Sequence, residues 1–495
     1  MPLPALSHRS RGIVLAGVLW LVATGRPTGQ AALQPAGWND GLKQTEAVDL
    51  NPDPNIVEIN LEARVATVEI APGQRVEAWT YNGTIPGPLI RVRSGNRLIV
   101  HFSNKLPEPS TVHWHGLRIP IQMDGVPGYS QPEVKPGESF TYDFIVPDAG
   151  LFWYHPHVMS AAQVGFGLYG ALLAEDPADP VGISDQLVIV LSDIAIDEAG
   201  RLEAPDSGGS TGMAFGREGN NVLVNGRRHS RITARAGVPQ RWRIVNTAKS
   251  RYFNLDLGAG QRFTKIGGDG GLQEYAQETD FVVLGPGERA DLIVSPRARP
   301  GSELVVRSQL YNRGYGSIEA RAVEDLFTIA LTREPEYKAP ARPPLRRAFD
   351  VPSTAGATPV KFDIGVIQGD TDHAFHYTVN GVSFPEPFLA KFGETQVWTV
   401  TNGTPWSHPI HLHGFFFLVL DDKGAPVHPL EWKDTLNVPF KETVRFLVRF
   451  DDRAGTWMLH CHILDHAEGG LMTALQLSAT GERKPEPADV EHRHQ

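Results

Sequence analysis

The sequence predicts an all-β protein made of three Greek-key β-sandwich domains. Its 495 residues include 50 glycines and 39 prolines, which suits a chain with many turns, and clear helical patterns of apolar residues are scarce. A pattern of turns and strands occurs three times, at intervals close to the size of one sandwich domain. Histidines cluster in the first and third copies of this pattern and are nearly missing from the second.

The repeated pattern consists of an Asn-Gly pair, a further glycine, and an asparagine nine positions after that glycine. Its copies are Asn82-Gly83 with Gly95 and Asn104, Asn225-Gly226 with Gly237 and Asn246, and Asn380-Gly381 with Gly393 and Asn402. A second turn marker follows each copy: Pro136-Gly137-Glu138, Pro286-Gly287-Glu288 and Lys441-Glu442. Asn-Gly and Pro-Gly are turn signals, and the runs between them are β-branched and aromatic. Successive copies start 143 and 155 residues apart, which is the size of a domain of short antiparallel strands.

These repeats place the three domains at residues 45–178, 183–334 and 345–483, followed by a polar tail at 484–495. Residues 1–32 have the features of a secretory signal peptide, with Arg9 and Arg11, twelve apolar residues at 12–23, and small residues at 29–32. Twelve residues are too few to span a bilayer, and no later stretch is long and apolar enough. We therefore expect an exported protein, periplasmic or extracellular. Because Ser10 separates the two arginines, the general secretory route is favoured over the twin-arginine route.

Charge and cysteine content narrow the possible partners. The net charge is −10 and there is no basic block, so nucleic acid is not an expected partner. One cysteine forms no internal disulfide. We expect small-molecule partners and a monomer.

Ten of the eighteen histidines lie in four short clusters, and the only cysteine lies in the last one. The clusters are His113-Trp114-His115, His155-Pro156-His157, His408-Pro409-Ile410-His411-Leu412-His413, and His460-Cys461-His462 followed by His466. Random order would give about 0.65 His-x-His pairs, whereas this sequence has five. One of the five, His492 with His494, lies in the polar tail and is assigned no role. The other four have apolar or aromatic surroundings, which indicates metal ligation.

Strand geometry suggests how these clusters bind metals. Residues i and i+2 of a strand face the same side, so each His-x-His pair offers two imidazoles to one site. His460 and His462 then face one side of their strand and Cys461 faces the other. His408 and His466 remain to join Cys461, and two imidazoles with a thiolate are the ligands of a blue-copper site. The middle domain, whose only histidine is His229 in a basic turn, is expected to act as a spacer and as a wall of the substrate site.

These four motifs resemble those of the multicopper oxidases, specifically the three-domain laccase-like branch, and the repeats extend the resemblance over the mature chain. The resemblance implies cupredoxin-like domains and about four copper ions per chain. It implies that His408, Cys461 and His466 bind the type 1 copper, and that His113 and His411 bind the type 2 copper. The implied ligands of the two type 3 coppers are His115, His155 and His462 for one ion, and His157, His413 and His460 for the other.

The resemblance also implies an activity, in which a reducing substrate is oxidised one electron at a time and O₂ is reduced to water between domains 1 and 3. Water formation consumes protons, so a buried acidic relay is expected. Asp124 matches the family's acidic residue near the trinuclear cluster, with a turn-forming role before Gly125 as the alternative. Glu468 is a second candidate. Bacterial relatives often carry Glu directly after the last type 1 histidine, where this chain has Ala467, so the second relay position departs from the family pattern.

The donor is predicted from the type 1 site. The resemblance implies that electrons enter at an exposed edge of His466. The six methionines form no cluster of the kind that binds Cu(I), which favours phenols and aromatic amines over Cu(I) or Fe(II). A copper nitrite reductase-like enzyme and a non-enzymatic copper-binding protein are two rival interpretations of the same motifs. The resemblance implies that the axial position of the type 1 copper lies five residues after His466, at Leu471. Met472 is then expected to point away, and a one-residue slip that lets Met472 bind the copper is the alternative. His373, His376 and His428 match no motif and are expected to be surface or packing residues.

Overall fold

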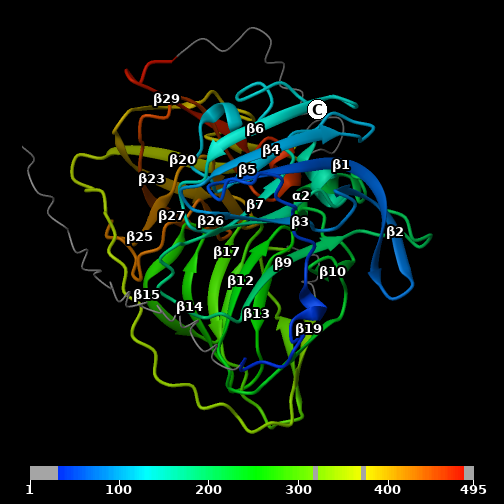
Figure 1. Cartoon of the computed structure of the whole chain (residues 1–495). Helices are drawn as coiled ribbons and strands as arrows, with labels where there is room; N and C mark the ends of the chain where they lie inside the picture. Colours follow the sequence, from blue (N-terminus) through cyan, green and yellow to red (C-terminus); the bar gives the residue numbers. More distant parts are fainter. Residues whose placement is uncertain (1–31, 316–321, 369–374, 484–495) are drawn as a thin grey trace, which may run out of the picture. The chain divides into compact units, whose positions relative to one another are not determined.

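The computed structural model describes residues 32–315, 322–368 and 375–483. These residues form mainly β-strands in six sheets, which occur as three pairs along the chain (Figure 1). The predicted all-β fold class is therefore confirmed. Apart from Ala32, the predicted signal peptide lies outside the described residues, and so does the polar tail.

The first pair of sheets carries the first two histidine clusters. One sheet has the order β2-β1-β4-β6, with β1 at Ile56–Ala71, β2 at Gln74–Tyr81, β4 at Arg97–Asn104 and β6 at Ser139–Ile145. The other has the order β3-β8-β7-β5, with β3 at Gly87–Arg93, β5 at His113–His115, β7 at Gly150–His155 and β8 at Gly170–Glu175. Short helices in this part of the chain are η1 (Asp40–Leu42), η2 (Ile121–Met123) and α1 (Ser160–Gly165).

The middle pair is drawn in green in Figure 1. One sheet has the order β10-β9-β12-β17-β14-β15, with β9 at Gln186–Ile194, β10 at Asn221–Val224, β12 at Gln240–Asn246, β14 at Phe263–Gly268, β15 at Gly271–Thr279 and β17 at Arg289–Val294. The other has the order β11-β19-β18-β13-β16, with β11 at Ser230–Ala234, β13 at Phe253–Asp256, β16 at Phe281–Leu284, β18 at Glu303–Ser308 and β19 at Glu324–Leu331. Helix α2 (Gly209–Phe215) leaves this pair between β9 and β10.

The third pair carries the last two histidine clusters. One sheet has the order β21-β20-β23-β27-β25, with β20 at Thr358–Gln368, β21 at Phe375–Val379, β23 at Thr395–Asn402, β25 at Phe417–Leu420 and β27 at Thr443–Arg449. The other has the order β22-β29-β28-β24-β26, with β22 at Phe388–Lys391, β24 at His408–Leu412, β26 at Thr435–Val438, β28 at Gly455–Cys461 and β29 at Met472–Ser478. Helix α3 (Leu464–Glu468) connects β28 to β29.

The three pairs share one topology. Each sheet contains a single parallel pairing, and its other pairings are antiparallel; the parallel pairings are β1 with β4, β3 with β8, β9 with β12, β11 with β19, β20 with β23, and β22 with β29. Strands that are distant in sequence therefore become neighbours, as in a Greek key. The histidine-bearing strands β5 and β24 occupy equivalent places, and so do β7 and β28.

The repeated asparagines explain why the sequence pattern recurs. Asn82, Asn225 and Asn380 have φ values of 52°, 51° and 52°, the left-handed conformation that asparagine tolerates at a turn. The asparagines that end β4, β12 and β23 are buried. Each donates from its side-chain amide to backbone carbonyls and accepts from a backbone N–H two residues on. The same side chain thus holds the loop after an equivalent strand in all three pairs.

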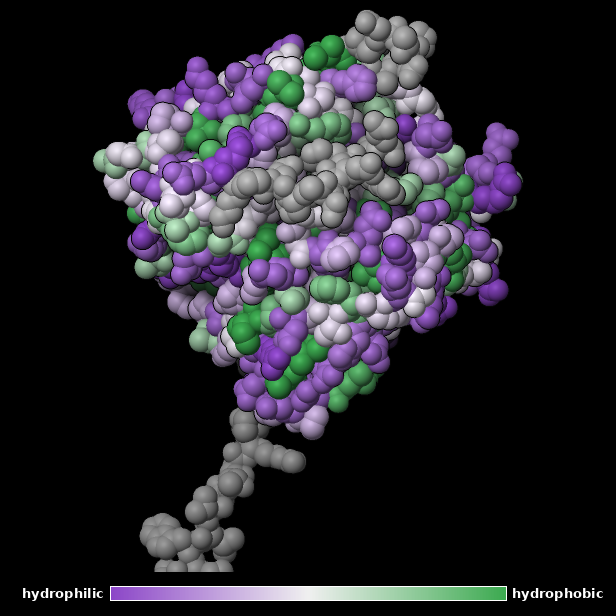
Figure 2. All heavy atoms as spheres, turned by 90° about the horizontal axis from the view of Figure 1, so that it is seen from above, coloured by the Kyte–Doolittle hydropathy of each residue, from purple (hydrophilic) through white to green (hydrophobic). Residues whose placement is uncertain are grey.

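Each pair of sheets encloses an apolar core containing a fully buried tryptophan, Trp114, Trp242 or Trp398. Figure 2 shows one face of the molecule, on which hydrophobic side chains are scattered among hydrophilic ones. In the part of the chain that the structure describes, no helix combines the length and the apolar character that a bilayer crossing needs.

Candidate metal centre

Four strands and the residues next to them bring the ten clustered histidines and Cys461 together. In the first pair, β5 and β7 run antiparallel with His113 opposite His155. In the third pair, β24 and β28 run antiparallel with His411 opposite His460 and Ile410 opposite Cys461. All eleven side chains are buried. The structure therefore brings the four motifs together in one buried region.

Eight of the histidines gather in a cluster between the first and third pairs. Two pairs of rings stack across this boundary, His115 on His411 with centroids 3.7 Å apart and His113 on His413 at 3.8 Å. Ring nitrogens close enough to share an ion occur in the groups His157-His413-His460, His113-His115-His155 and His113-His411-His413.

The first group matches one set of type 3 ligands implied by the resemblance. For the second set, His115 and His155 are grouped with His113. The His462 ring lies 4.9 Å from the His115 ring and 5.4 Å from the His155 ring, between centroids. All eight histidines are therefore neighbours, and the division of ligands between individual ions stays a prediction.

The hydrogen bond made by one nitrogen of each imidazole ring determines which nitrogen remains available to a metal. Nδ1 of His113, His155 and His411 lies within 3.0 Å of the carbonyl oxygen of Asp124, Pro156 and Asp434 respectively. A carbonyl only accepts, so these Nδ1 atoms are protonated and Nε2 carries the lone pair. His115 is reversed, because its Nε2 lies 3.2 Å from both the Asp434 carboxylate and the Thr435 hydroxyl.

The remaining nitrogens fit a metal ligand set. Nε2 of His113, His155 and His411, Nδ1 of His115, and both nitrogens of His462 are buried without a hydrogen-bond partner among the described residues. Buried polar atoms normally have partners, so a group of unsatisfied ones at a single place indicates a binding site for an ion. Burial lowers the pKa of His115, His155 and His413 far below the usual value. The second cause is a neighbouring ring, which is His411 for His115 and His113 for the other two. These rings are therefore neutral, which is the ligating form.

A second site lies on the other side of β28. The Cys461 sulfur is 3.5 Å from Nδ1 of His408 and 3.9 Å from Nδ1 of His466, and these two nitrogens are 3.1 Å apart. Burial lowers the pKa of His408 to about 3 and raises that of the Cys461 thiol. A cation at this position would favour the thiolate, so the group fits a soft or borderline metal better than a free thiol.

The residues at the axial position are Leu471, just before β29, and Met472, the first residue of β29. Leu471 is fully buried in the core cluster that contains Cys461, whereas Met472 packs in a different cluster with Val126 and Met458. Leucine offers no lone pair, so this site has three strong donors and no axial thioether from residue 471.

The expected exposed edge of His466 is wrong for this structure. The His466 side chain is 0% exposed. The Tyr377 ring lies over it with centroids 4.3 Å apart, and the Tyr377 hydroxyl donates at 2.6 Å to the carbonyl of Ala214 in α2. Helix α2 belongs to the middle sheet pair, so the sequence of the last cluster alone could not reveal this cover.

Asp124 reaches the eight-histidine cluster directly. One carboxylate oxygen is 2.8 Å from Nδ1 of His413, and the Asp124 carbonyl accepts from Nδ1 of His113 at 2.7 Å. The residue is buried and precedes Gly125, whose φ is 80°. Asp124 thus lies at the cluster and also forms the turn.

Glu468 lies further along the same boundary. One of its carboxylate oxygens accepts from the backbone N–H of Ala161 in α1, at 2.9 Å. Burial raises the pKa of Glu468 to about 7. Its described hydrogen bond joins α3 to α1 rather than reaching a histidine ring, so its place in a proton path stays a prediction.

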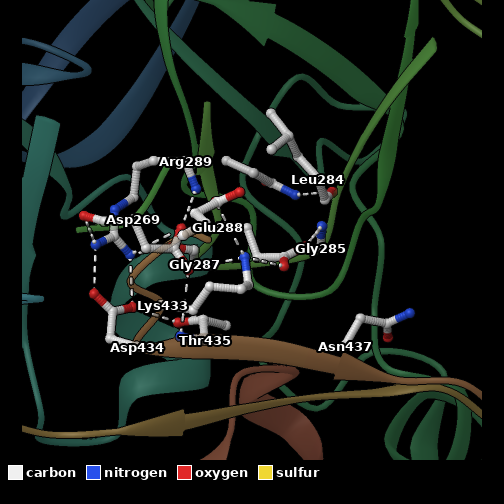
Figure 3. A network of polar contacts seen from close by, with 12 residues as sticks. Asp269, Leu284, Gly285, Gly287, Glu288, Arg289, Lys433, Asp434, Thr435 and Asn437 are labelled. Atoms are coloured by element: carbon white, nitrogen blue, oxygen red, sulfur yellow. Dashed lines mark hydrogen bonds and ion pairs between the residues drawn. The ribbon is translucent and has the colours of Figure 1, made fainter. Parts of the chain in front are cut away.

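The sequence prediction missed a buried charged network beside the cluster (Figure 3). Arg289 of β17 pairs with Asp434, which in turn contacts His115 and His411. The middle pair is therefore more than a spacer. Pro286-Gly287-Glu288 was interpreted only as a turn marker, and nothing in the sequence of residues 431–435 indicates that they contact another domain.

Among the described residues, no unassigned histidine belongs to a group that could hold a metal ion. His428 is exposed and pairs with Glu274 at 2.6 Å, and His376 is exposed on β21. His229 adopts a φ of 54° in a turn. His373, His492 and His494 lie outside the described residues.

Comparison with known proteins agrees with this geometry. Multicopper oxidase family models match residues 62–179, 185–323 and 354–480. A crystal structure of a multicopper oxidase from Pseudomonas thermotolerans is 32% identical, with a TM-score of 0.72, over 85% of this chain and 99% of that one. A multicopper oxidase from Campylobacter jejuni described as a metallo-oxidase is 27% identical, with a TM-score of 0.77, over 90% and 99%. A laccase from Bacillus subtilis is 26% identical over 81% of this chain and 90% of its own.

The chain belongs to the multicopper oxidase family and is a copper-dependent oxidoreductase. The resemblance inferred from the histidine motifs is thereby confirmed.

Proposed function

We propose that the protein is a laccase-like oxidase that oxidises phenols and aromatic amines and reduces O₂ to water. The observation that carries this proposal is the arrangement on β28, where Cys461 faces His408 and His466 while His460 faces His157 and His413. One strand thus joins a His₂Cys site to an eight-histidine cluster through a few covalent bonds.

We assign about four coppers to these residues. His408, Cys461 and His466 would hold the type 1 ion. The other eight histidines would hold the type 2 and type 3 ions with the division that the resemblance implies. When bound, copper supplies one-electron oxidation of the donor at the first site and four-electron reduction of O₂ at the second.

The chain contributes a buried ligand set and an acidic residue beside it. Burial keeps the imidazoles neutral, so they do not need to lose protons before binding a metal. Asp124 is held against His413 and His113, within reach of a proton acceptor in the cluster. An acidic residue at that position could pass on protons that are consumed when O₂ is reduced to water.

The charges near the His₂Cys site support an organic donor. The Asp465 carboxylate, next to His466, is buried and ion-paired with Arg217 and with Lys249 at 3.6 Å. Glu218 pairs with Arg313 at 3.0 Å. Because these carboxylates are already paired with cations, they are poor candidates for binding Fe(II). A relative from Bacillus subtilis is named a laccase, which also supports an organic donor.

The second candidate is a metallo-oxidase for Cu(I) or Fe(II). Complete burial of His466 supports it, because a small ion needs less access than an aromatic ring. The Campylobacter jejuni relative is described as a metallo-oxidase. A copper nitrite reductase-like enzyme or a non-enzymatic copper protein receives less support, since neither needs the eight-histidine cluster. We further propose export through residues 1–32 and a monomeric state.

Oxygen uptake by the copper-loaded protein tests the proposal. We expect about four coppers per chain and O₂ consumption driven by a methoxyphenol with a larger kcat/KM than that for Fe(II) or Cu(I). A larger value for either metal ion would favour the metallo-oxidase. A single copper per chain with no O₂ uptake would contradict both oxidase proposals.

A further inference from the structure

We propose that Arg289 of the middle sheet pair is a positioning residue for the eight-histidine cluster and acts through Asp434 of the third pair. The inference rests on the proposed copper assignment. In Figure 3 the Arg289 side chain points at Asp434, and both lie in a network that includes Asp269, Glu288 and Lys433. Arg289 is not a ligand, and its effect on copper would pass through the carboxylate that it holds.

Arg289 uses every donor of its guanidinium. Nη1 donates to Asp434 Oδ1 at 2.7 Å and to the Gly287 carbonyl at 2.9 Å. Nη2 donates to Asp434 Oδ2 and, at 2.9 Å, to the Asp269 carbonyl. Nε donates to the Leu151 carbonyl at 3.1 Å. Five donors therefore meet five acceptors, and these acceptors come from all three sheet pairs, with Leu151 on the strand that ends in His155.

Asp434 transfers this fixed geometry to two histidines. Its carboxylate lies 3.2 Å from Nε2 of His115, and its carbonyl accepts from Nδ1 of His411 at 2.9 Å. The Thr435 hydroxyl donates to the same carboxylate oxygen at 2.8 Å. Asp434 thus sets opposite ring orientations in two stacked histidines. His115 presents Nδ1 to the cluster and His411 presents Nε2.

Close packing leaves the network little freedom to move. A side chain at Gly116 would come within 2.6 Å of both the Arg289 guanidinium and the Asp434 carboxylate. A side chain at Gly287 would come within 3.0 Å of the rings of His115 and His462. The turn before β17 therefore forms a wall of the histidine cluster, and two glycines permit the approach.

Further ion pairs hold the ends of the network. The Asp269 carboxylate accepts from the backbone N–H of Arg289 at 2.8 Å and lies 3.1 Å from Nζ of Lys433. Nζ of Lys433 is also 3.1 Å from the Glu288 carboxylate. Glu288 precedes Arg289 in sequence, and Lys433 precedes Asp434. The ion pair between Glu288 and Lys433 therefore runs beside the Arg289–Asp434 pair.

Lysine could not replace Arg289 in this position. Its ammonium group has three donors and lacks the planar fork that binds both carboxylate oxygens. Asp434 would then lose one of its two guanidinium bonds, and its contact with His115 would no longer be fixed. Changes to such outer contacts of metal ligands cost roughly 10–100-fold in metal affinity.

The test compares Arg289→Lys with Arg241→Lys. Arg241 is the matched control, because it is a buried arginine of the neighbouring strand β12 that forks onto Asp291 and does not contact the histidine cluster. Copper would be counted after dialysis against a graded chelator. The electron paramagnetic resonance signal of the non-thiolate copper would be recorded, and the blue thiolate band would serve as an internal reference for folding.

We expect Arg289→Lys to keep the blue band, to alter the non-thiolate signal, and to release cluster copper at a chelator concentration roughly 10–100-fold lower than wild type. Arg241→Lys should resemble wild type in all three readouts. Asp434→Asn should reproduce the effect, and the double variant should be no worse than either single one. Equal copper retention and an unchanged signal in Arg289→Lys would overturn the inference. About one copper in the wild type would instead refute the proposed function.

A measurement on the wild type decides the question if the variants do not fold. In crystals of the copper-loaded protein, His115 must bind copper through Nδ1 while Nε2 stays on Asp434, and Asp434 must stay on Arg289. Binding of His115 through Nε2, or an Asp434 turned away from Arg289, would overturn the inference without contradicting the copper assignment.

Discussion

The middle and third sheet pairs have equivalent strands but differ in the potential metal ligands that these strands carry. Strands β24 and β28 of the third pair carry His408, His411, His460 and Cys461, whereas their counterparts β13 and β18 carry no histidine or cysteine. His413 follows β24 directly in sequence, and His462 follows β28. Both pairs enclose an extensive apolar core. The two pairs therefore differ by a few side chains on equivalent strands, and the contribution that we propose for the middle pair is made by Arg289.

The largest expected effect comes from removing the Cys461 thiolate of the third pair. Cys461→Ser should abolish the blue colour, which comes from copper–thiolate charge transfer, and should abolish donor oxidation. The eight-histidine cluster should still bind copper, because none of its side chains changes. Absorption spectra and copper counts check this, and a variant that stays blue and active would refute the assignment.

A change at Asp124 should affect the reaction at the eight-histidine cluster and leave the reaction at the His₂Cys site unchanged. Asp124→Asn keeps the shape and the turn but removes the proton-carrying carboxylate beside His413. We expect O₂ reduction to slow by roughly 10²-fold, with little change in the rate at which a donor reduces the type 1 copper. Stopped-flow absorption under anaerobic and aerobic conditions measures the two steps. Equal slowing of both would leave Asp124 with only its turn-forming role.

The equivalent asparagines Asn246 and Asn402 allow a direct comparison of the same loop in the middle and third sheet pairs. Replacing either by Ala leaves buried carbonyls without donors, so each should cost roughly 1–3 kcal/mol in the free energy of unfolding. Only Asn402→Ala should also change the type 1 spectrum. The Thr404 hydroxyl lies 2.8 Å from the Asn402 side-chain oxygen and 2.7 Å from Nε2 of His408.

Denaturant unfolding and the blue absorption band measure these two effects separately. A spectral change in Asn246→Ala, or none in Asn402→Ala, would contradict the assigned roles of the two loops.

The smallest expected effect concerns the axial position. A leucine donates no electron density to oxidised copper, so the potential of the type 1 site should be high, and Leu471→Met should lower it. Met472→Leu should barely change it, since Met472 packs in a separate cluster with Val126. Redox titration of both variants decides, and a large shift from Met472→Leu alone would mean that the strand register is wrong.

The sequence predicted the features that depend on local geometry. Alternation along strands separated Cys461 from His460, and repeated turn residues indicated three equivalent units. The features that it missed depend on contacts between segments that are distant in sequence, some of them in different units. The cover over His466 comes from α2 and β21, and the support of His115 comes from Arg289, more than 170 positions away. No periodicity or spacing in one segment reports such an approach.

The most direct test of the central claim is anomalous diffraction at the copper edge from crystals of the copper-loaded protein. The account predicts one peak between His408, Cys461 and His466, and about three peaks among the eight histidines between the first and third sheet pairs. A single peak at Cys461 with none among the eight histidines would contradict it.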